Sequence, residues 1–148
     1  RDKDAVIASL LLCQAAAKAK AEGKTLLDEL DLLLKTYGYH AERVKSYTLQ
    51  GMEGAERIKE IMRTLREQPP EQIAGSRVIE SKDYAPGIDG FPCSDVLYYT
   101  LENDQWVCVR PSGTEPKIKF YGGAKGKDLL ESRKILDDII AWSDEVVG

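Results

Sequence analysis

Two strands joined by a polar turn are predicted by the stretch Trp106-Val107-Cys108-Val109-Arg110-Pro111-Ser112-Gly113-Thr114-Glu115-Pro116-Lys117-Ile118-Lys119-Phe120-Tyr121. Its first four residues are rich in β-formers, and its last five alternate between polar and apolar side chains at the period of a half-buried strand.

The turn between these strands carries groups suited to binding a phosphate. It offers the guanidinium of Arg110, the hydroxyls of Ser112 and Thr114, and the backbone N–H of Gly113, which a ligand can approach closely. Arginine binds phosphate in a bidentate manner, hydroxyls and amides satisfy the remaining oxygens, and Lys119 adds a second positive charge. The same residues also fit an ordinary hairpin turn with an exposed arginine, because Gly, Ser and Thr are common in turns.

The sequence around this stretch predicts an α+β fold. Hydrophobic periodicity and the Pro69-Pro70 stop predict a helix over 53–67, strands over 76–84, 95–101, 105–110 and 117–122, and a helix over 127–145. This order predicts a four-stranded antiparallel sheet with helices on one face.

The first fifty residues read differently. A helix over 4–21 is apolar almost all round, a second over 24–37 carries a leucine stripe, and residues 39–50 look extended. A helix that is apolar on most faces must be buried. The two helices therefore need cover from elsewhere, and we expect them to pack on each other, on the 53–67 helix, or on a second copy of the chain in a dimer.

Composition limits the classes of function. Hydrophobic residues at 43% and charged residues at 31% are typical of a globular domain. A net charge of −4 argues against a general nucleic-acid binder. Three cysteines in no close pair predict a reducing, cytoplasmic location and neither a disulfide framework nor a zinc site. The sequence contains no apolar run long enough to predict a membrane span.

As a contiguous string, residues 110–121 resemble the C-terminal phosphate-binding loop of the α-D-phosphohexomutases, the phosphoglucomutase/phosphomannomutase family. Residues 94–103 are similar to the strand and turn that precede this loop. Upstream, Asp2-Lys3-Asp4-Ala5, the stretch 23–28 and Tyr37-Gly38-Tyr39 resemble the end of the family's third domain. The resemblance therefore runs along nearly the whole chain.

The resemblance implies a domain division and a fold. Residues 1–50 would be the last helices and linker strand of the third domain, and 51–148 the C-terminal phosphate-binding domain, a fold likened to the TATA-binding protein. The family's catalytic serine, its metal-binding Asp-Gly-Asp loop and its sugar-reading Glu-Glu-Ser motif have no match here. We therefore expect a C-terminal fragment with no catalytic residue and no metal site, inactive by itself.

The resemblance also implies a reaction and a site. The parent enzyme would interconvert hexose 1-phosphate and 6-phosphate through a phosphoserine, magnesium and a glucose 1,6-bisphosphate intermediate. Its partners would be the phosphosugar and the other three domains of the parent chain, with no nucleic acid and no membrane. The residues expected to hold the substrate phosphate are Arg110, Ser112, Gly113, Thr114, Lys119 and Lys3.

Several alternatives stay open. The sequence does not name the sugar, so a phosphopentomutase or phosphoglucosamine mutase fragment is possible, although Trp106 and residues 117–121 resemble the phosphoglucomutase or phosphopentomutase branch more closely. A stand-alone anion-binding or interaction module is a competing class. A nucleic-acid-binding domain is suggested only by fold analogy, which is no warrant for function.

Overall fold

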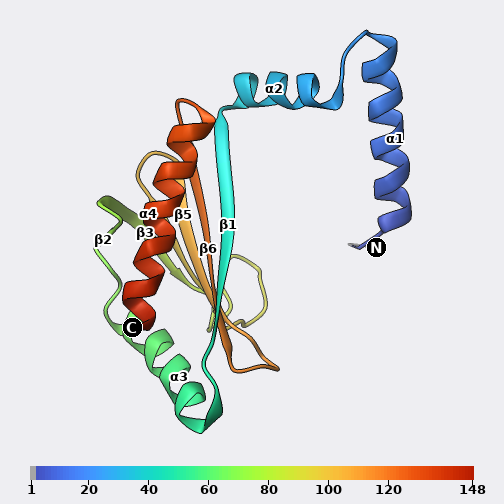
Figure 1. The fold of residues 1–148 in the computed structure, drawn as a ribbon. Helices are drawn as coiled ribbons and strands as arrows, with labels where there is room; N and C mark the ends of the chain where they lie inside the picture. The colour runs from blue at the N-terminus through green and yellow to red at the C-terminus, as the bar shows by residue number, and fades with distance from the viewer. Residues whose placement is uncertain (1–2) are drawn as a thin grey trace. The chain divides into compact units, whose positions relative to one another are not determined.

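The computed structural model describes residues 3–148 (Figure 1). Its contacts divide the chain into two units, the first ending at Gly38 and the second running from Tyr39 to Gly148. Asp2, which belongs to the upstream motif, lies outside the described residues.

The first unit consists of two capped helices, α1 (Ala5–Ala21) and α2 (Leu26–Tyr37). The Asp4 carboxylate accepts a hydrogen bond from the N–H of Ile7 at 2.9 Å. Thr25 and Asp28 form a capping box at the start of α2. Both predicted helices are confirmed. Burial on most faces was predicted for residues 4–21, but Ala19 is the only buried residue of α1, and α2 has none within the described chain.

The second unit is a six-stranded sheet with two long helices. In chain order its elements are β1 (Tyr39–Thr48), α3 (Gly51–Glu67), β2 (Gln72–Ile73), β3 (Ser76–Asp83), β4 (Leu97–Leu101), β5 (Gln105–Pro111), β6 (Lys117–Gly126) and α4 (Leu129–Val147). The strands lie in the order β1-β6-β5-β4-β3-β2, and every neighbouring pair is antiparallel. The α+β class is confirmed.

The prediction of four strands is wrong. Strand β6 extends to Gly126, and β1 pairs with its whole length, from Tyr39 opposite Gly126 to Thr48 opposite Lys117. This pairing covers backbone groups that would otherwise leave β6 as a bare edge. The short β2 closes the opposite side against β3. Because β1 belongs to this sheet, the structural division lies between Gly38 and Tyr39. The family-domain boundary after residue 50 stays a prediction, and so does the likeness to the TATA-binding protein.

The core lies on one face of the sheet, between the strands and the helices α3 and α4 (Figure 1). Alternate residues of β4, β5 and β6 point into it, and the largest fully buried side chains there are Tyr99 and Phe120. Helix α3 contributes Ile58, Ile61, Met62 and Leu65, and α4 contributes Leu136, Ile139 and Ile140. Helices on one face of an antiparallel sheet were predicted, and this arrangement is confirmed.

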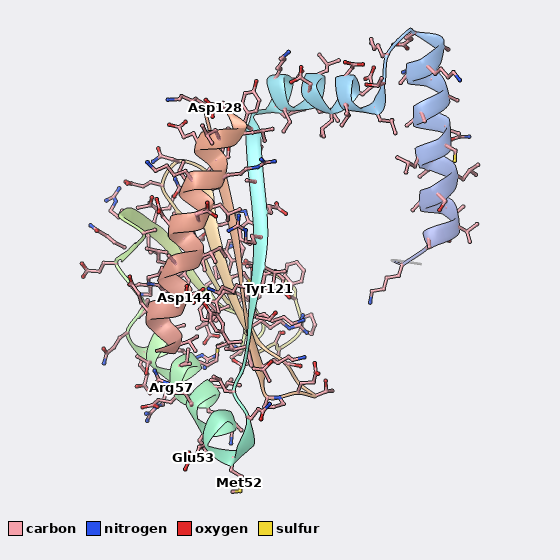
Figure 2. All side chains as sticks on the ribbon, in the orientation of Figure 1. Met52, Glu53, Arg57, Tyr121, Asp128 and Asp144 are labelled. Carbon is pink, nitrogen blue, oxygen red and sulfur yellow. The ribbon has the colours of Figure 1, made fainter. Side chains whose placement is uncertain are left out.

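Polar contacts fix the long C-terminal helix against the edge strand. Asp128, labelled at the start of α4 in Figure 2, accepts a hydrogen bond from the N–H of Glu131 at 2.8 Å. Near the other end, the carboxylate of Asp144 accepts from Lys45 Nζ at 2.6 Å and from the Tyr47 hydroxyl at 2.8 Å. Strand β1 is therefore held both to β6 and to α4.

Candidate functional site

The predicted polar turn forms the closed end of the β5–β6 hairpin. Strand β5 ends at Pro111, which pairs with Ile118 of β6. Beyond this pair, the N–H of Ser112 donates to the carbonyl of Lys117 at 2.8 Å, and the N–H of Lys117 donates to the carbonyl of Glu115 at 2.7 Å. Figure 1 shows this turn at the same end of the sheet as α3.

The hairpin register brings two cations opposite each other. Arg110 and Lys119 are cross-strand partners, which places their Cβ atoms about 5 Å apart. Their neighbours Val109, Ile118 and Phe120 are buried, so both cations lie on the face away from the core. Within residues 3–148, neither side chain has a hydrogen bond or an ion pair. Facing like charges repel, and an anion bound beside them would relieve that repulsion.

A pocket of about 400 Å³ lies between the hairpin turn and α3. Helix α3 supplies Ala55, Ile58 and Lys59, the segment before β4 supplies Ser94 and Asp95, and the hairpin supplies Arg110, Pro111, Ser112, Gly113, Glu115 and Pro116. Its size and mixed polarity suit a small polar ligand.

The two carboxylates that line this pocket are each paired with a cation outside its lining. Asp95 accepts from Arg66 Nη2 at 2.7 Å, and Glu115 accepts from Lys117 Nζ at 2.9 Å. The hydrogen bond and positive charge of Lys117, with a smaller effect of Lys119, lower the pKa of Glu115. Each carboxylate is therefore compensated by a cation that does not itself line the pocket.

The two cations that line the pocket differ in their pairing. Lys59 donates to Glu56 at 2.7 Å along α3. Arg110 is exposed and, in the part of the chain that the structure describes, has no such partner. Its charge acts at longer range on Cys108, where it opposes the effect of burial, which raises the pKa of that thiol. Arg110 is thus the lining cation available to an incoming anion.

The structure brings together most of the residues predicted for phosphate binding. Arg110, Ser112 and Gly113 line the pocket. Thr114 is in the same turn, where its N–H lies 3.5 Å from Ser112 Oγ, and Lys119 faces Arg110. Lys3 belongs to the first unit and is exposed there.

The environment of Gly113 leaves room for a ligand. A Cβ atom built on this glycine would meet no atom of the chain within 4 Å. Packing within the described chain therefore does not require glycine at this position.

Sequence reasoning assigned no role in the site to three charged lining residues, Lys59, Asp95 and Glu115, the last of which lies within the predicted turn. Lys59 lies on a helix face that reads as plain solvated surface, and nothing local marks its proximity to the turn. The position of Asp95 could have been inferred from the predicted hairpin. Leu97 pairs with Val109, and extending this register by two residues places Asp95 beside Pro111, at the start of the turn.

No group of three or more His, Cys, Asp or Glu side chains that could hold a metal ion is found within residues 3–148. In the same part of the chain, no helix combines the length and apolarity needed to cross a membrane.

Comparison with known proteins adds to this geometry. Residues 67–139, which include the hairpin, match the family model described as phosphoglucomutase/phosphomannomutase, C-terminal domain. Two phosphoglucomutases from strains of Staphylococcus aureus are 39% and 38% identical to the chain over 141 and 139 residues, covering 87% of it in each case. The chain spans about a quarter of the length of these relatives.

A solved structure supports the fold. The open form of parafusin, an exocytosis-sensitive phosphoprotein and phosphoglucomutase from Paramecium, aligns with 83% of the chain at a TM-score of 0.57 and 17% identity, over 22% of its own length. The chain therefore shares its α+β fold with part of that longer protein. The chain belongs to the phosphoglucomutase/phosphomannomutase family and corresponds to its C-terminal part.

Proposed function

We propose that this chain is the part of a phosphohexomutase that binds the substrate phosphate, in an enzyme that interconverts hexose 1-phosphate and hexose 6-phosphate. The observation that carries the proposal is Arg110, an exposed arginine without an ion pair among the described residues, which lines a pocket and faces Lys119. Membership of the family supports the same assignment.

Each group of the turn has a distinct role in this proposal. The planar fork of Arg110 holds two phosphate oxygens at once, and Lys119 adds charge. The hydroxyls of Ser112 and Thr114 and the N–H of Gly113 donate to the remaining oxygens. Lys3 would reach the phosphosugar from the first unit, as its position in the upstream motif implies.

The chemistry of the reaction explains a site that binds phosphate and carries no sugar-reading groups. Phosphoryl transfer depends chiefly on positioning and charge stabilisation. A bisphosphorylated intermediate must turn end for end, so that either phosphate occupies this site while the other meets the phosphoserine. A turn made of a guanidinium, hydroxyls and an amide accepts both phosphates equally.

Magnesium and glucose 1,6-bisphosphate would act in the parent enzyme. The described residues do not fit a magnesium site, since they contain no cluster of candidate ligands, and we assign no step through the metal to this chain. We place the catalytic serine, the metal loop and the other three domains in the remainder of a cytoplasmic parent protein. The isolated 148-residue chain should then show no turnover of glucose 1-phosphate with glucose 1,6-bisphosphate and magnesium.

The exposed apolar side chains of the first unit fit this proposal. They include Val6, Leu11, Leu12 and Leu27, each of which is more than half exposed. In the parent enzyme they would be covered by the rest of the third domain. In the isolated chain, light scattering would reveal whether a dimer covers them instead.

Phosphate titration of the isotope-labelled chain, followed by NMR, tests the site directly. We expect amide shifts that cluster in residues 110–119, with a dissociation constant of about 1 mM, or about −4 kcal/mol. Arg110→Ala should abolish these shifts, and Arg110→Lys should weaken them, because lysine keeps the charge but loses the fork.

Arg77→Ala is the matched control for these variants. Arg77 pairs with Glu102 at 2.9 Å and lies outside the pocket lining, so its loss should leave phosphate binding unchanged. Shifts that cluster away from residues 110–119, or that survive Arg110→Ala, would refute the proposed site. They would also favour the competing class, a stand-alone module with a different anion site.

A further inference from the structure

The pocket proposed to bind phosphate is lined by as many carboxylates as cations. Asp95 and Glu115 oppose Lys59 and Arg110. An unpaired carboxylate in such a pocket repels a phosphate dianion, and the repulsion grows as the pocket excludes water. Binding therefore requires that the negative charges be compensated from outside the lining.

Glu115 is compensated locally by Lys117, two residues away on the same turn. Asp95 is compensated by a residue that is far away in the sequence. Its partner Arg66 lies near the end of α3, and its side chain is 32% exposed. Nothing in the sequence connects these two residues, since they come from different elements separated by two strands and a long loop.

Arg66 is held in place by a second carboxylate. Its Nε donates to Asp83 Oδ2 at 2.8 Å while Nη2 donates to Asp95 Oδ1 at 2.7 Å. The other oxygen of Asp83 accepts from the N–H of Ala85 at 3.0 Å. Burial opposes the charge of Arg66, but the bonds to Asp83 and Asp95 outweigh it and raise the pKa of the guanidinium. The cation is therefore permanent and fixed in orientation.

We propose that Arg66 is a positioning residue of the phosphate site, which neutralises Asp95 so that this carboxylate does not repel the substrate phosphate from the pocket that Arg110 lines. The inference rests on the proposed function. It assigns to α3, through Arg66, a part in phosphate binding that no contact with the ligand would reveal.

Arginine suits this role better than lysine does. The guanidinium donates to Asp83 and Asp95 from different nitrogens of one planar group, whereas an ammonium presents a single point charge. In Arg66→Gln, Asp95 loses its cation and is left as a free carboxylate in the same pocket as Arg110. It then repels the phosphate dianion from that pocket.

A charge-removal cycle in the 148-residue chain tests the proposal with inorganic phosphate as the probe. Phosphate affinity is measured by NMR titration for the unmodified chain, Arg66→Gln, Asp95→Asn and the double variant. We expect Arg66→Gln to weaken phosphate binding about tenfold. Asp95→Asn alone should bind phosphate at least as tightly as the unmodified chain, and the double variant should regain the affinity of Asp95→Asn.

Rescue by Asp95→Asn separates neutralisation from simple structural support. If the ion pair only held the segment before β4 in place, Asp95→Asn would weaken binding by itself and would not rescue Arg66→Gln. Either result overturns the inference. Arg77→Gln, which removes an ion-paired arginine outside the pocket lining, is the control and should leave affinity unchanged.

Failure of this inference is distinguishable from failure of the proposed function. If the unmodified chain binds no phosphate at residues 110–119, both the proposed function and the inference about Arg66 are refuted. If the unmodified chain binds phosphate there and Arg66→Gln binds it equally well, only the role of Arg66 is refuted.

Discussion

The hydroxyl of Tyr99 donates a hydrogen bond to a carbonyl in the last turn of α3, and the Tyr99→Phe variant should measure how much this bond contributes to stability. Tyr99 is fully buried, and its hydroxyl donates to the carbonyl of Leu65 at 3.0 Å. In a continuing helix this carbonyl would accept from the residue four positions on. That residue is Pro69, which has no N–H, and α3 ends at Glu67. Tyr99 therefore supplies a donor that the helix itself cannot provide.

The expected cost follows from the environment of this bond. Phenylalanine keeps the ring packing but leaves a buried carbonyl without its donor, which costs about 1–2 kcal/mol of unfolding free energy. For a unit of this size, that corresponds to a fall of about 4–8 °C in melting temperature. Thermal unfolding followed by near-ultraviolet circular dichroism reports on the aromatic core of the second unit and gives both quantities.

Tyr98→Phe is the matched control for this experiment. Tyr98 is the next residue back along β4, on the opposite face, where its ring stacks on Trp106 at a centroid distance of 5.7 Å. Its hydroxyl makes no hydrogen bond with the described residues, so its removal should change stability by less than about 0.5 kcal/mol. Equal losses in the two variants would refute the role assigned to the Tyr99 hydroxyl.

Two further predictions concern the second unit. Gly54→Ala should lower the unfolding free energy of this unit by about 1–3 kcal/mol in urea unfolding, because a Cβ there would lie 2.1 Å from the carbonyl oxygen of Leu49 and the backbone would have to move. Gly113→Ala is the control: its Cβ would meet open space, so this variant should unfold as the unmodified chain does. Asp144 has a lowered pKa, first through its hydrogen bond from Lys45, so its contribution to stability is present above its unfolded pKa and is lost as the pH falls through the lower folded value. Asp144→Asn should therefore be less stable than the unmodified chain near neutral pH and should lose less stability on acidification below about pH 4; parallel acid unfolding curves for the two chains would contradict this.

Much of the second unit could be predicted because its elements carry local signals. The alternation in residues 97–101 and 105–109 settles which side chains of β4 and β5 enter the core. The apolar face of α3, from Ile58 to Leu65, is buried as its spacing predicts. These features depend on side-chain period within one element, and period is visible in the sequence.

Strand β1 shows where such reasoning ends. Its residues read as extended, but their partners on β6 lie about eighty residues further along the chain, from Thr48 opposite Lys117 to Tyr39 opposite Gly126. The alternation of apolar and polar residues along a strand determines which face of the sheet each side chain occupies. It does not determine which neighbouring strand the strand pairs with. The prediction of four strands was wrong for this reason.

The candidate site divides in the same way. The sequence by itself determined the turn chemistry of Arg110, Ser112 and Gly113, because those groups are adjacent in the chain and resemble a known phosphate loop. Only the tertiary structure placed Asp95 in the same pocket and Arg66 beside it. Electrostatic compensation depends on distance in space, and the distance between a helix end and a strand start is decided by how α3 packs on the sheet.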